Sequence, residues 1–282
     1  MNDRLAVLPQ YLLPKRLLTE AAGALARRES GALTTWTIRR FIQRYGVDMA
    51  EAADPDPAAY ASFNAFFTRA LRPGARPLAS AALISPVDGA ISQFGRIAAD
   101  QVFQAKGHGY STTALVGGDA ALAAPYADGW FATLYLSPRD YHRIHMPCAG
   151  RLRQMIHVPG ELFSVNPTTA RGVPGLFARN ERVVCVFDDA AGRPFVLVLV
   201  GATIVGSMAT VWHGQVNPPR SGQLQRWHYE GSAVELAQGA EMGRFLLGST
   251  VVMLFPAGPL RFNPDWAPAG AIRMGQAMAQ LG

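Results

Sequence analysis

The stretch Phe195-Val-Leu-Val-Leu-Val-Gly-Ala-Thr-Ile-Val205 decides the class of fold that this chain adopts. It is rich in β-branched residues and follows a proline, a pattern typical of a β-strand. Similar short apolar runs, bounded by glycine and proline, recur from about residue 82 onward. The other predicted strands are Trp130–Leu136, Arg182–Phe187, Met208–Trp212 and Phe245–Phe255.

The chain before residue 82 has helical patterns instead. One helix has a predicted cap at Thr34 or Thr35, and an earlier helix begins at Pro14. The apolar face of the capped helix consists of Ile38, Phe41, Ile42 and Tyr45, and that of a third helix, which ends at Arg72-Pro-Gly74, consists of Phe63, Phe66, Phe67 and Leu71. The sequence therefore predicts an α+β fold, in which N-terminal amphipathic helices (residues 1–50) precede a mostly antiparallel, β-rich catalytic core (residues 51–282).

The positive charge of the chain is concentrated in its helical part. The 282 residues carry 26 basic and 20 acidic side chains, and residues 1–45 alone hold eight basic and three acidic ones, a net charge of +5 out of +6. This excess favours anionic partners. Basic amphipathic helices can lie in the interface of an anionic membrane. The alternative is a helical layer packed on the domain, with its arginines in water.

Composition excludes several classes of protein. A 49% share of hydrophobic residues excludes disorder as the main state. Cys148 and Cys185 are too few for a disulfide framework and suit a reducing compartment. No run approaches the ~20 apolar residues that a transmembrane helix needs. Asp3, with prolines at Pro9 and Pro14, makes the N-terminus a poor secretory signal.

Three short motifs carry reactive side chains. Tyr141-His-Arg-Ile-His-Met-Pro147 places two histidines three residues apart after an apolar strand, where they can act as acid, base or metal ligand. Ser85-Pro-Val-Asp-Gly89 puts an aspartate in a tight turn, and Gly248-Ser249-Thr250 interrupts an apolar strand. Each motif also has an ordinary explanation: core histidines, turn chemistry and a strand bulge.

An aspartate, a histidine and a serine in suitable geometry activate a hydroxyl, because the imidazole takes the proton and the carboxylate fixes its tautomer. The glycine before Ser249 leaves its own carbonyl open to attack by that hydroxyl. The chain lacks the Gly-x-Ser-x-Gly elbow of the α/β hydrolases, and no alternating strand and helix pattern surrounds Ser249. An ordinary serine hydrolase is therefore disfavoured.

Together with Val158-Pro-Gly-Glu-Leu-Phe-Ser164, these motifs resemble the phosphatidylserine decarboxylase family in its bacterial, peripheral-membrane form. The resemblance extends from Phe63-Asn-Ala-Phe-Phe-Thr-Arg69 to Phe255, and the Gly-Ser-Thr triplet is intact. One departure is Ala237-Gln-Gly-Ala240, where the family often has Lys-Gly. This departure lies outside the chemical core.

The resemblance implies a zymogen that cleaves itself. Ser249 would attack the carbonyl of Gly248, and the chain would break into residues 1–248 and 249–282. Ser249 would thereby become a pyruvoyl group. His145 would be the general base, and Asp88 its orienting partner.

The same resemblance implies the decarboxylation of phosphatidylserine to phosphatidylethanolamine. A Schiff base between the pyruvoyl ketone and the serine amine would accept the electrons released with carbon dioxide. His142 would act in this step as proton donor or orienter. No metal and no pyridoxal phosphate are expected, and the only lysines that could hold the latter, Lys15 and Lys106, have no phosphate-binding signature nearby.

A substrate pocket is expected close to these residues. Three large apolar side chains are predicted either to line it or to pack in the core: Phe163, Met146 and Phe245. The stretch Val158–Ser164 is predicted to form a loop over the lipid headgroup, with a nearby arginine such as Arg143 receiving the phosphate.

The implied partners are phosphatidylserine, an anionic membrane surface and the two cleavage fragments as a heterodimer, on the cytoplasmic face of the bacterial inner membrane. A homo-oligomer stays open, and no nucleic acid is expected. Two other functions also remain open. One is a zinc hydrolase with His142, His145, His213 and Asp88 as ligands. The other is a non-catalytic lipid-binding protein in which Ser249 stays unprocessed.

Overall fold

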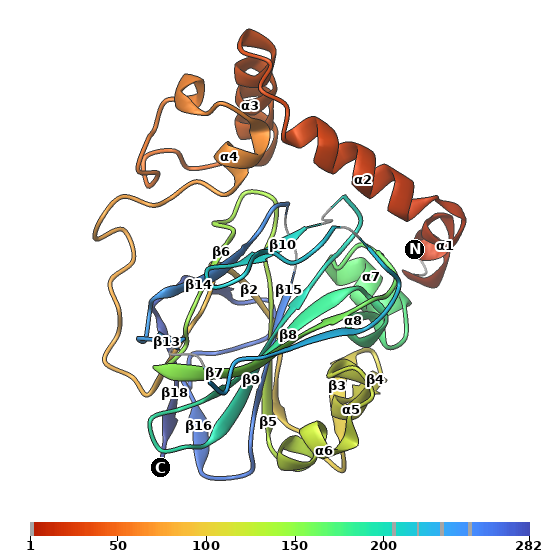
Figure 1. Cartoon of the computed structure of the whole chain (residues 1–282), viewed down its shortest axis with the longest axis vertical. Coiled ribbons are helices and arrows are strands. Elements are labelled where there is room, and N and C mark those ends of the chain that lie inside the picture. The colour runs from red at the N-terminus through yellow and green to blue at the C-terminus, as the bar shows by residue number, and fades with distance from the viewer. Residues whose placement is uncertain (1–2, 205–206, 219, 232–233, 248–249) are drawn as a thin grey trace.

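The computed structural model describes residues 3–204, 207–218, 220–231, 234–247 and 250–282. The N-terminal helices lie toward one end of the molecule, next to a β-rich body that carries the shorter helices on its side (Figure 1). The N-terminal helices are α1 (Asp3–Leu12), α2 (Lys15–Ala26), α3 (Ala32–Tyr45) and α4 (Phe63–Phe67). The predicted α+β class, with helices first and an antiparallel body after them, is confirmed.

A nine-stranded sheet forms the centre of the body. Its order is β12-β7-β8-β9-β15-β5-β2-β17, with β13 also paired to β7, and the pairings between these described strands are antiparallel. The strands are β12 (Gln225–His228), β7 (Gly150–Val158), β8 (Arg182–Asp188), β9 (Pro194–Val200), β15 (Thr250–Phe255), β5 (Trp130–Tyr135), β2 (Gly89–Arg96), β17 (Ala271–Ile272) and β13 (Glu235–Leu236).

Smaller sheets and short helices surround this centre. The four-stranded sheet contains β11 (Gly214–Gln215), β10 (Met208–Thr210), β14 (Glu241–Phe245) and β6 (Arg143–His145). The three-stranded sheet contains β1 (Leu83–Ile84), β18 (Ala277–Leu281) and β16 (Leu260–Phe262), and a hairpin joins β3 (Gln101–Ala105) to β4 (His108–Ser111). The helices are α5 (Thr112–Leu115), α6 (Ala120–Ala123), α7 (Pro167–Gly172) and α8 (Leu176–Arg179), with single 3-10 turns at Pro57–Ala59 and Ala124–Tyr126.

The central sheet is buried on both faces. Because successive strand residues point to opposite faces, β9 sends Val196, Val198 and Val200 into one apolar cluster and Leu197 and Leu199 into another. The first cluster also contains residues of α3 and α4. The N-terminal helices therefore share a core with the body.

Two details of the N-terminal helices differ from prediction. Helix α1 was not predicted at all. Helix α3 begins at Ala32, after Gly31, whose φ of 53° suits glycine. The prediction of a cap at Thr34 or Thr35 is therefore wrong. The Thr34 hydroxyl instead accepts a hydrogen bond from the Ser30 N–H at 3.0 Å, which closes the turn between α2 and α3.

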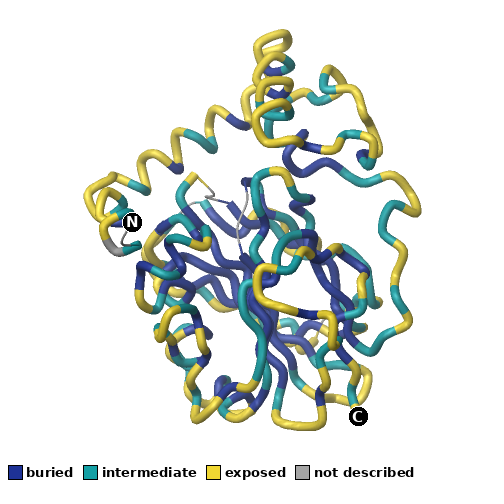
Figure 2. Tube along the Cα trace, turned by 180° about the vertical axis from the view of Figure 1, so that it is seen from behind, coloured by how far each residue is buried: buried dark blue, intermediate teal, exposed yellow. Residues whose placement is uncertain are grey.

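Most of the apolar face predicted for α3 packs inside the protein, whereas its last member, Tyr45, is exposed. Ile38 is fully buried, and the ring centroid of Phe41 lies 5.0 Å from that of Phe63 and 5.9 Å from that of Phe66. This face therefore follows the alternative of a helical layer packed on the domain. Figure 2 shows long exposed stretches on these helices. The large apolar side chains exposed on α1, α2, α3 and the turn between α1 and α2 are Leu5, Leu8, Tyr11, Leu12, Leu13, Leu17, Leu18, Leu25, Leu33, Trp36 and Tyr45.

The predicted single strand Phe245–Phe255 is wrong. Strand β14 ends at Phe245 in the four-stranded sheet, and β15 begins at Thr250 in the nine-stranded sheet. The chain therefore passes from one sheet to another around the Gly-Ser-Thr motif. The predicted strand Phe195–Val205 also ends early, at Val200.

Candidate active site

A cavity of about 710 Å³ lies between the N-terminal helices and the β body. We call it the helix-side cavity. Leu25 and Phe41 line it from the helices, and Tyr135, Ser164 and Leu247 line it from the body. Most of the described lining side chains are apolar, and such a cavity suits a ligand with a large apolar part.

The predicted cleavage site adjoins this cavity along the chain. Gly248 and Ser249 lie outside the described residues, but both flanking residues are described. Leu247 lines the helix-side cavity, and Thr250 starts β15 as the partner of Tyr135. Thr250 is fully buried, and its hydroxyl has no hydrogen-bond partner among the described residues. The motif is therefore bounded by a cavity wall on one side and a core strand on the other.

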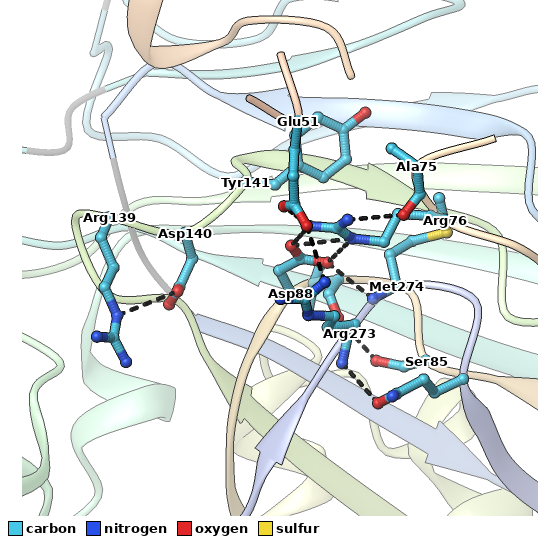
Figure 3. A network of polar contacts seen from close by, with 12 residues as sticks. Glu51, Ala75, Arg76, Ser85, Asp88, Arg139, Asp140, Tyr141, Arg273 and Met274 are labelled. Carbon is cyan, nitrogen blue, oxygen red and sulfur yellow. Dashed lines mark hydrogen bonds and ion pairs between the residues drawn. The ribbon is translucent and has the colours of Figure 1, made fainter. Parts of the chain in front are cut away.

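Asp88 lies just before β2, in a network of charges that Figure 3 shows at close range. The Arg76 Nε donates to its two carboxylate oxygens at 3.0 and 3.2 Å, and the Met274 N–H donates to Oδ1 at 2.8 Å. Arg76 Nη2 is shared between Asp88, at 2.5 Å, and Glu51, at 2.6 Å. Glu51 also pairs with Arg273, and its hydrogen bond from Arg76 lowers the pKa of the Glu51 carboxyl.

His145 is held at both ring nitrogens. Nδ1 lies 2.8 Å from the Gly239 carbonyl, and Nε2 lies 2.9 Å from the Tyr141 hydroxyl. A carbonyl only accepts, so Nδ1 carries the hydrogen, and the Tyr141 hydroxyl donates to Nε2 in the neutral ring. Burial lowers the pKa of His145, while the Gly239 contact and the charges of Glu241 and Asp88 oppose this shift. The ring is therefore a neutral base with a fixed tautomer.

His142 is fully buried, and its ring centroid lies 4.1 Å from that of Phe67, which lines the helix-side cavity. Its Nδ1 donates to the Asp140 carbonyl at 2.7 Å. Nε2 is buried without a hydrogen-bond partner within the described ranges. Burial lowers the pKa of His142 to about 3. A backbone link also joins this residue to the cleavage region, because the Phe245 N–H donates to the His142 carbonyl at 3.1 Å.

Asp88 and His145 form their hydrogen bonds with different partners. In the described part of the chain no hydrogen bond joins them, and Asp88 reaches His145 only through its charge. Ala90, two residues after Asp88, and Thr250, one residue after Ser249, pair with Tyr135 from opposite sides. These two backbone positions are therefore two strand spacings apart, roughly 10 Å.

Several other residues singled out in the sequence have structural roles. The three large apolar side chains of the predicted pocket are buried, and the described lining of the helix-side cavity contains none of them: Phe163, Met146 and Phe245. Arg143 bonds to the Thr68 carbonyl at 2.8 Å and to Glu241 at 2.8 Å. Its guanidinium is therefore already bound by other groups of the protein, which does not favour the predicted contact with the lipid phosphate. Of the loop Val158–Ser164, only Ser164 lines the cavity.

The residues of the zinc alternative do not assemble. No group of three or more His, Cys, Asp or Glu side chains in the described part of the chain could hold a metal ion. His213 is exposed and bonds through Nδ1 to the Tyr229 hydroxyl at 3.2 Å. A separate finding concerns the helices: those in the described ranges all fall short of the length and apolar character that crossing a bilayer requires.

Sequence reasoning missed Arg76, Tyr141 and Gly239. Arg76 and Asp88 are only twelve residues apart, but the pattern around Arg76 reads as an ordinary loop. Tyr141 belongs to the histidine motif, and its spacing of four from His145 could have suggested a contact. Nothing in the sequence points to Gly239, because its carbonyl meets His145 across 94 residues of chain.

The protein is of the α+β class, and the wall of its apolar cavity includes Leu247, the residue before the Gly-Ser-Thr sequence. A family model described as phosphatidylserine decarboxylase matches residues 63–280, and a second, described as PSD, matches residues 5–46. The chain belongs to the phosphatidylserine decarboxylase family.

The similarity to individual relatives extends over the whole length of this chain. The chain is similar to proteins named phosphatidylserine decarboxylase proenzyme from three bacteria. It is 73% identical to that of Variovorax paradoxus, with 100% of this chain and 99% of the relative covered. It is 72% identical to that of Polaromonas naphthalenivorans, with 100% and 98% covered. It is 73% identical to that of Azoarcus sp., with 100% and 97% covered.

Proposed function

We propose that this chain is a proenzyme that cleaves itself between Gly248 and Ser249 and then decarboxylates phosphatidylserine to phosphatidylethanolamine. The observation that carries the proposal is the apolar cavity whose wall includes Leu247, the residue before the Gly-Ser pair. The full-length similarity to relatives named proenzymes supports it.

In the first reaction the Ser249 hydroxyl attacks the Gly248 carbonyl carbon and turns the amide into an ester. Elimination then breaks the chain, leaving a carboxylate on Gly248 and a dehydroalanine at position 249, which water hydrolyses to the pyruvoyl ketone with loss of ammonia. His145 takes the serine proton at Nε2, because its Nδ1 hydrogen is committed to the Gly239 carbonyl. The Tyr141 hydroxyl occupies Nε2 and has to give way for this transfer. Asp88 acts through its negative charge, which favours the imidazolium.

The second reaction uses the pyruvoyl group formed at position 249, whose ketone takes up the substrate amine and accepts the electrons released with carbon dioxide. His142 moves the proton. Its Nε2 has no partner among the described residues, so it is available to exchange a proton with the substrate and to return one to the α-carbon. Burial lowers the pKa of His142, so the ring starts neutral. Neither a metal nor pyridoxal phosphate is needed.

The apolar lining of the helix-side cavity suits this reaction as well. A carboxylate is stabilised by water more than the charge-dispersed transition state in which it leaves. The lining of this cavity is mostly apolar and stabilises the carboxylate less than water does. The cavity therefore favours the loss of carbon dioxide.

Residues 1–50 form the proposed membrane-associating part, and residues 51–282 carry the chemistry. The exposed leucines of α1 and α2 and the positive charge of this part support a peripheral position on an anionic bilayer. Leu25 is both exposed and part of the cavity lining, so a lipid could pass from the bilayer into the cavity. We place the enzyme on the cytoplasmic face of the bacterial inner membrane, with its two fragments bound as a heterodimer.

The first test is the state of the chain itself. We expect a denaturing gel and an intact mass to give fragments of residues 1–248 and 249–282, the shorter one blocked to Edman chemistry by its pyruvoyl terminus. Ser249→Ala should stay a single chain, because it lacks the nucleophile. The parent should release carbon dioxide from phosphatidylserine. A free serine at the start of the short fragment of active protein would refute the proposal.

The same assay separates the roles of the site residues. Asp88→Asn and His145→Ala should each block cleavage, since the first removes the negative charge that favours the imidazolium and the second removes the base. His142→Ala should cleave at least partly and decarboxylate poorly. Circular dichroism and thermal melting check that each variant is folded. Identical defects in folded His142→Ala and His145→Ala would show that the two roles are wrongly divided.

A further inference from the structure

Among the described residues that line the helix-side cavity, only Arg28 is charged. It lies in the turn between α2 and α3, where its N–H donates to the Leu25 carbonyl at 3.1 Å. Leu25 and Leu33, on either side of this turn, line the same cavity. The backbone of Arg28 is therefore fixed at the wall of the cavity.

The charge of Arg28 has no carboxylate partner in the described part of the chain. Glu29 follows it directly, but Glu29 does not line the cavity and forms no ion pair there with Arg28. Two other arginines discussed above differ, because Arg76 and Arg143 are neutralised by carboxylates at 2.8 Å or less. A cation that lines an apolar cavity without a counter-charge is suited to an anionic ligand.

We propose that Arg28 binds the phosphodiester of the lipid that enters this cavity. The inference rests on the proposed function, which supplies phosphatidylserine as the ligand. That headgroup has two anionic groups, a carboxylate and a phosphodiester. A guanidinium on the carboxylate would stabilise the charge that the reaction has to disperse and would therefore raise the barrier. The phosphodiester keeps its charge throughout, so binding it carries no such penalty.

The size of the cavity agrees with this assignment. A volume of 710 Å³ is within the usual range for small-ligand sites, and a sphere of that volume is roughly 11 Å across. Four bonds separate the reactive amine from the phosphorus, a distance on the order of 5 Å for bonds of about 1.5 Å. The headgroup is therefore short enough to lie within the cavity.

The alternative is that Arg28 only helps the enzyme bind to membranes or complements the C-terminal end of the α2 dipole. The experiment therefore uses dihexanoylphosphatidylserine as dissolved monomers, without a bilayer. The variants are Arg28→Gln and Arg28→Lys. Arg28 and Arg39 are both exposed residues, but only Arg28 lines the cavity, so Arg39→Gln, which removes the same charge from α3, is the matched control.

For Arg28→Gln we expect normal self-cleavage, a kcat within twofold of the parent and a KM for the monomeric substrate raised at least tenfold. The split arises because the lost interaction binds ground state and transition state equally. Arg28→Lys should recover part of the loss, and Arg39→Gln should leave KM unchanged. Dihexanoylphosphatidylethanolamine, which lacks the carboxylate, should lose potency as an inhibitor of Arg28→Gln by the same factor.

Other results would overturn the proposal. An unchanged KM for the monomeric substrate, with weaker binding to vesicles alone, would assign Arg28 to the membrane surface. A raised KM with unchanged inhibition by the ethanolamine lipid would assign it to the carboxylate. Failure of the proposed function looks different, because the parent itself would then neither cleave nor decarboxylate.

Discussion

His142 illustrates how one buried side chain can affect both chemistry and stability. Its ring is closed off from water, its Nδ1 is committed to a carbonyl, and its Nε2 has no partner among the described residues. The folded protein therefore resists protonation of this ring, with a pKa of about 3, whereas an unfolded chain titrates at the ordinary value of 6.5. The unfolded state binds more protons between these two values, so folding stability falls as the pH drops through 6.5.

We expect the parent to lose about 1 kcal/mol of stability through this group between pH 7.5 and 5.5. His142→Asn, which cannot titrate but can still reach the Asp140 carbonyl, should lose less, and thermal or urea unfolding at the two pH values measures the difference. The exposed His228→Asn serves as the control, and equal acid sensitivity of both variants would contradict the prediction. At this scale the motifs of the sequence single out Asp88, His142, His145 and Ser249 as predicted site residues. It could not identify what holds them, because the contacts of His145 with Gly239 and of Asp88 with Met274 depend on how distant strands pair.

The helices show that a correctly predicted amphipathic pattern does not reveal what its apolar face will contact. The period of α3 was predicted correctly, but its apolar face contacts α4, and the exposed apolar side chains lie elsewhere on α1, α2 and α3. An amphipathic pattern states only that one face avoids water, and a protein core and a bilayer satisfy it equally. The strands show a similar limit, since the apolar run at 245–255 gives no sign that it passes from one sheet to another.

We predict that Leu12→Ser with Leu17→Ser, at positions 89% and 69% exposed, lowers vesicle affinity at least tenfold, because each buried leucine contributes about 1.5–3 kcal/mol. The loss should persist in 1 M salt, where the Debye length is only about 3 Å. Co-sedimentation with phosphatidylserine vesicles across a salt series measures it, and Phe103→Ser, an exposed apolar position on β3, is the control. Ile38→Ser should instead lower the melting temperature. Unchanged vesicle binding in the double variant would place the membrane contact outside α1 and α2.

The whole molecule is built so that self-cleavage need not separate its parts. Residues 250–282 supply β15 to the middle of the nine-stranded sheet, β17 to its edge, and β16 and β18 to the three-stranded sheet. Val251–Leu254 are fully buried, and β15 pairs along its length with β5 and β9. We therefore predict that the two fragments of the matured protein elute together in gel filtration without denaturant. They should separate only at urea concentrations that also abolish the native circular dichroism. A short fragment that leaves under native conditions would contradict this arrangement. The sequence predicted the two-part α+β architecture, because composition and periodicity change near residue 82. It did not predict the strand order, since antiparallel pairing between β15 and β5 joins segments more than a hundred residues apart.

The position of β15 also bears on when the protein can mature during its synthesis. Ribosomes make a chain from its N-terminus, and the first 249 residues include both neighbours of β15 but not β15 itself. Until the last tenth of the message has been translated, the nascent sheet has a gap between β9 and β5, with unpaired backbone groups on both sides of it. A chain released early would expose these edges and be a target for aggregation or proteolysis. The same gap would leave the proposed Gly-Ser cleavage site without the strand that follows it, so we expect self-cleavage only after β15 has been made and has paired.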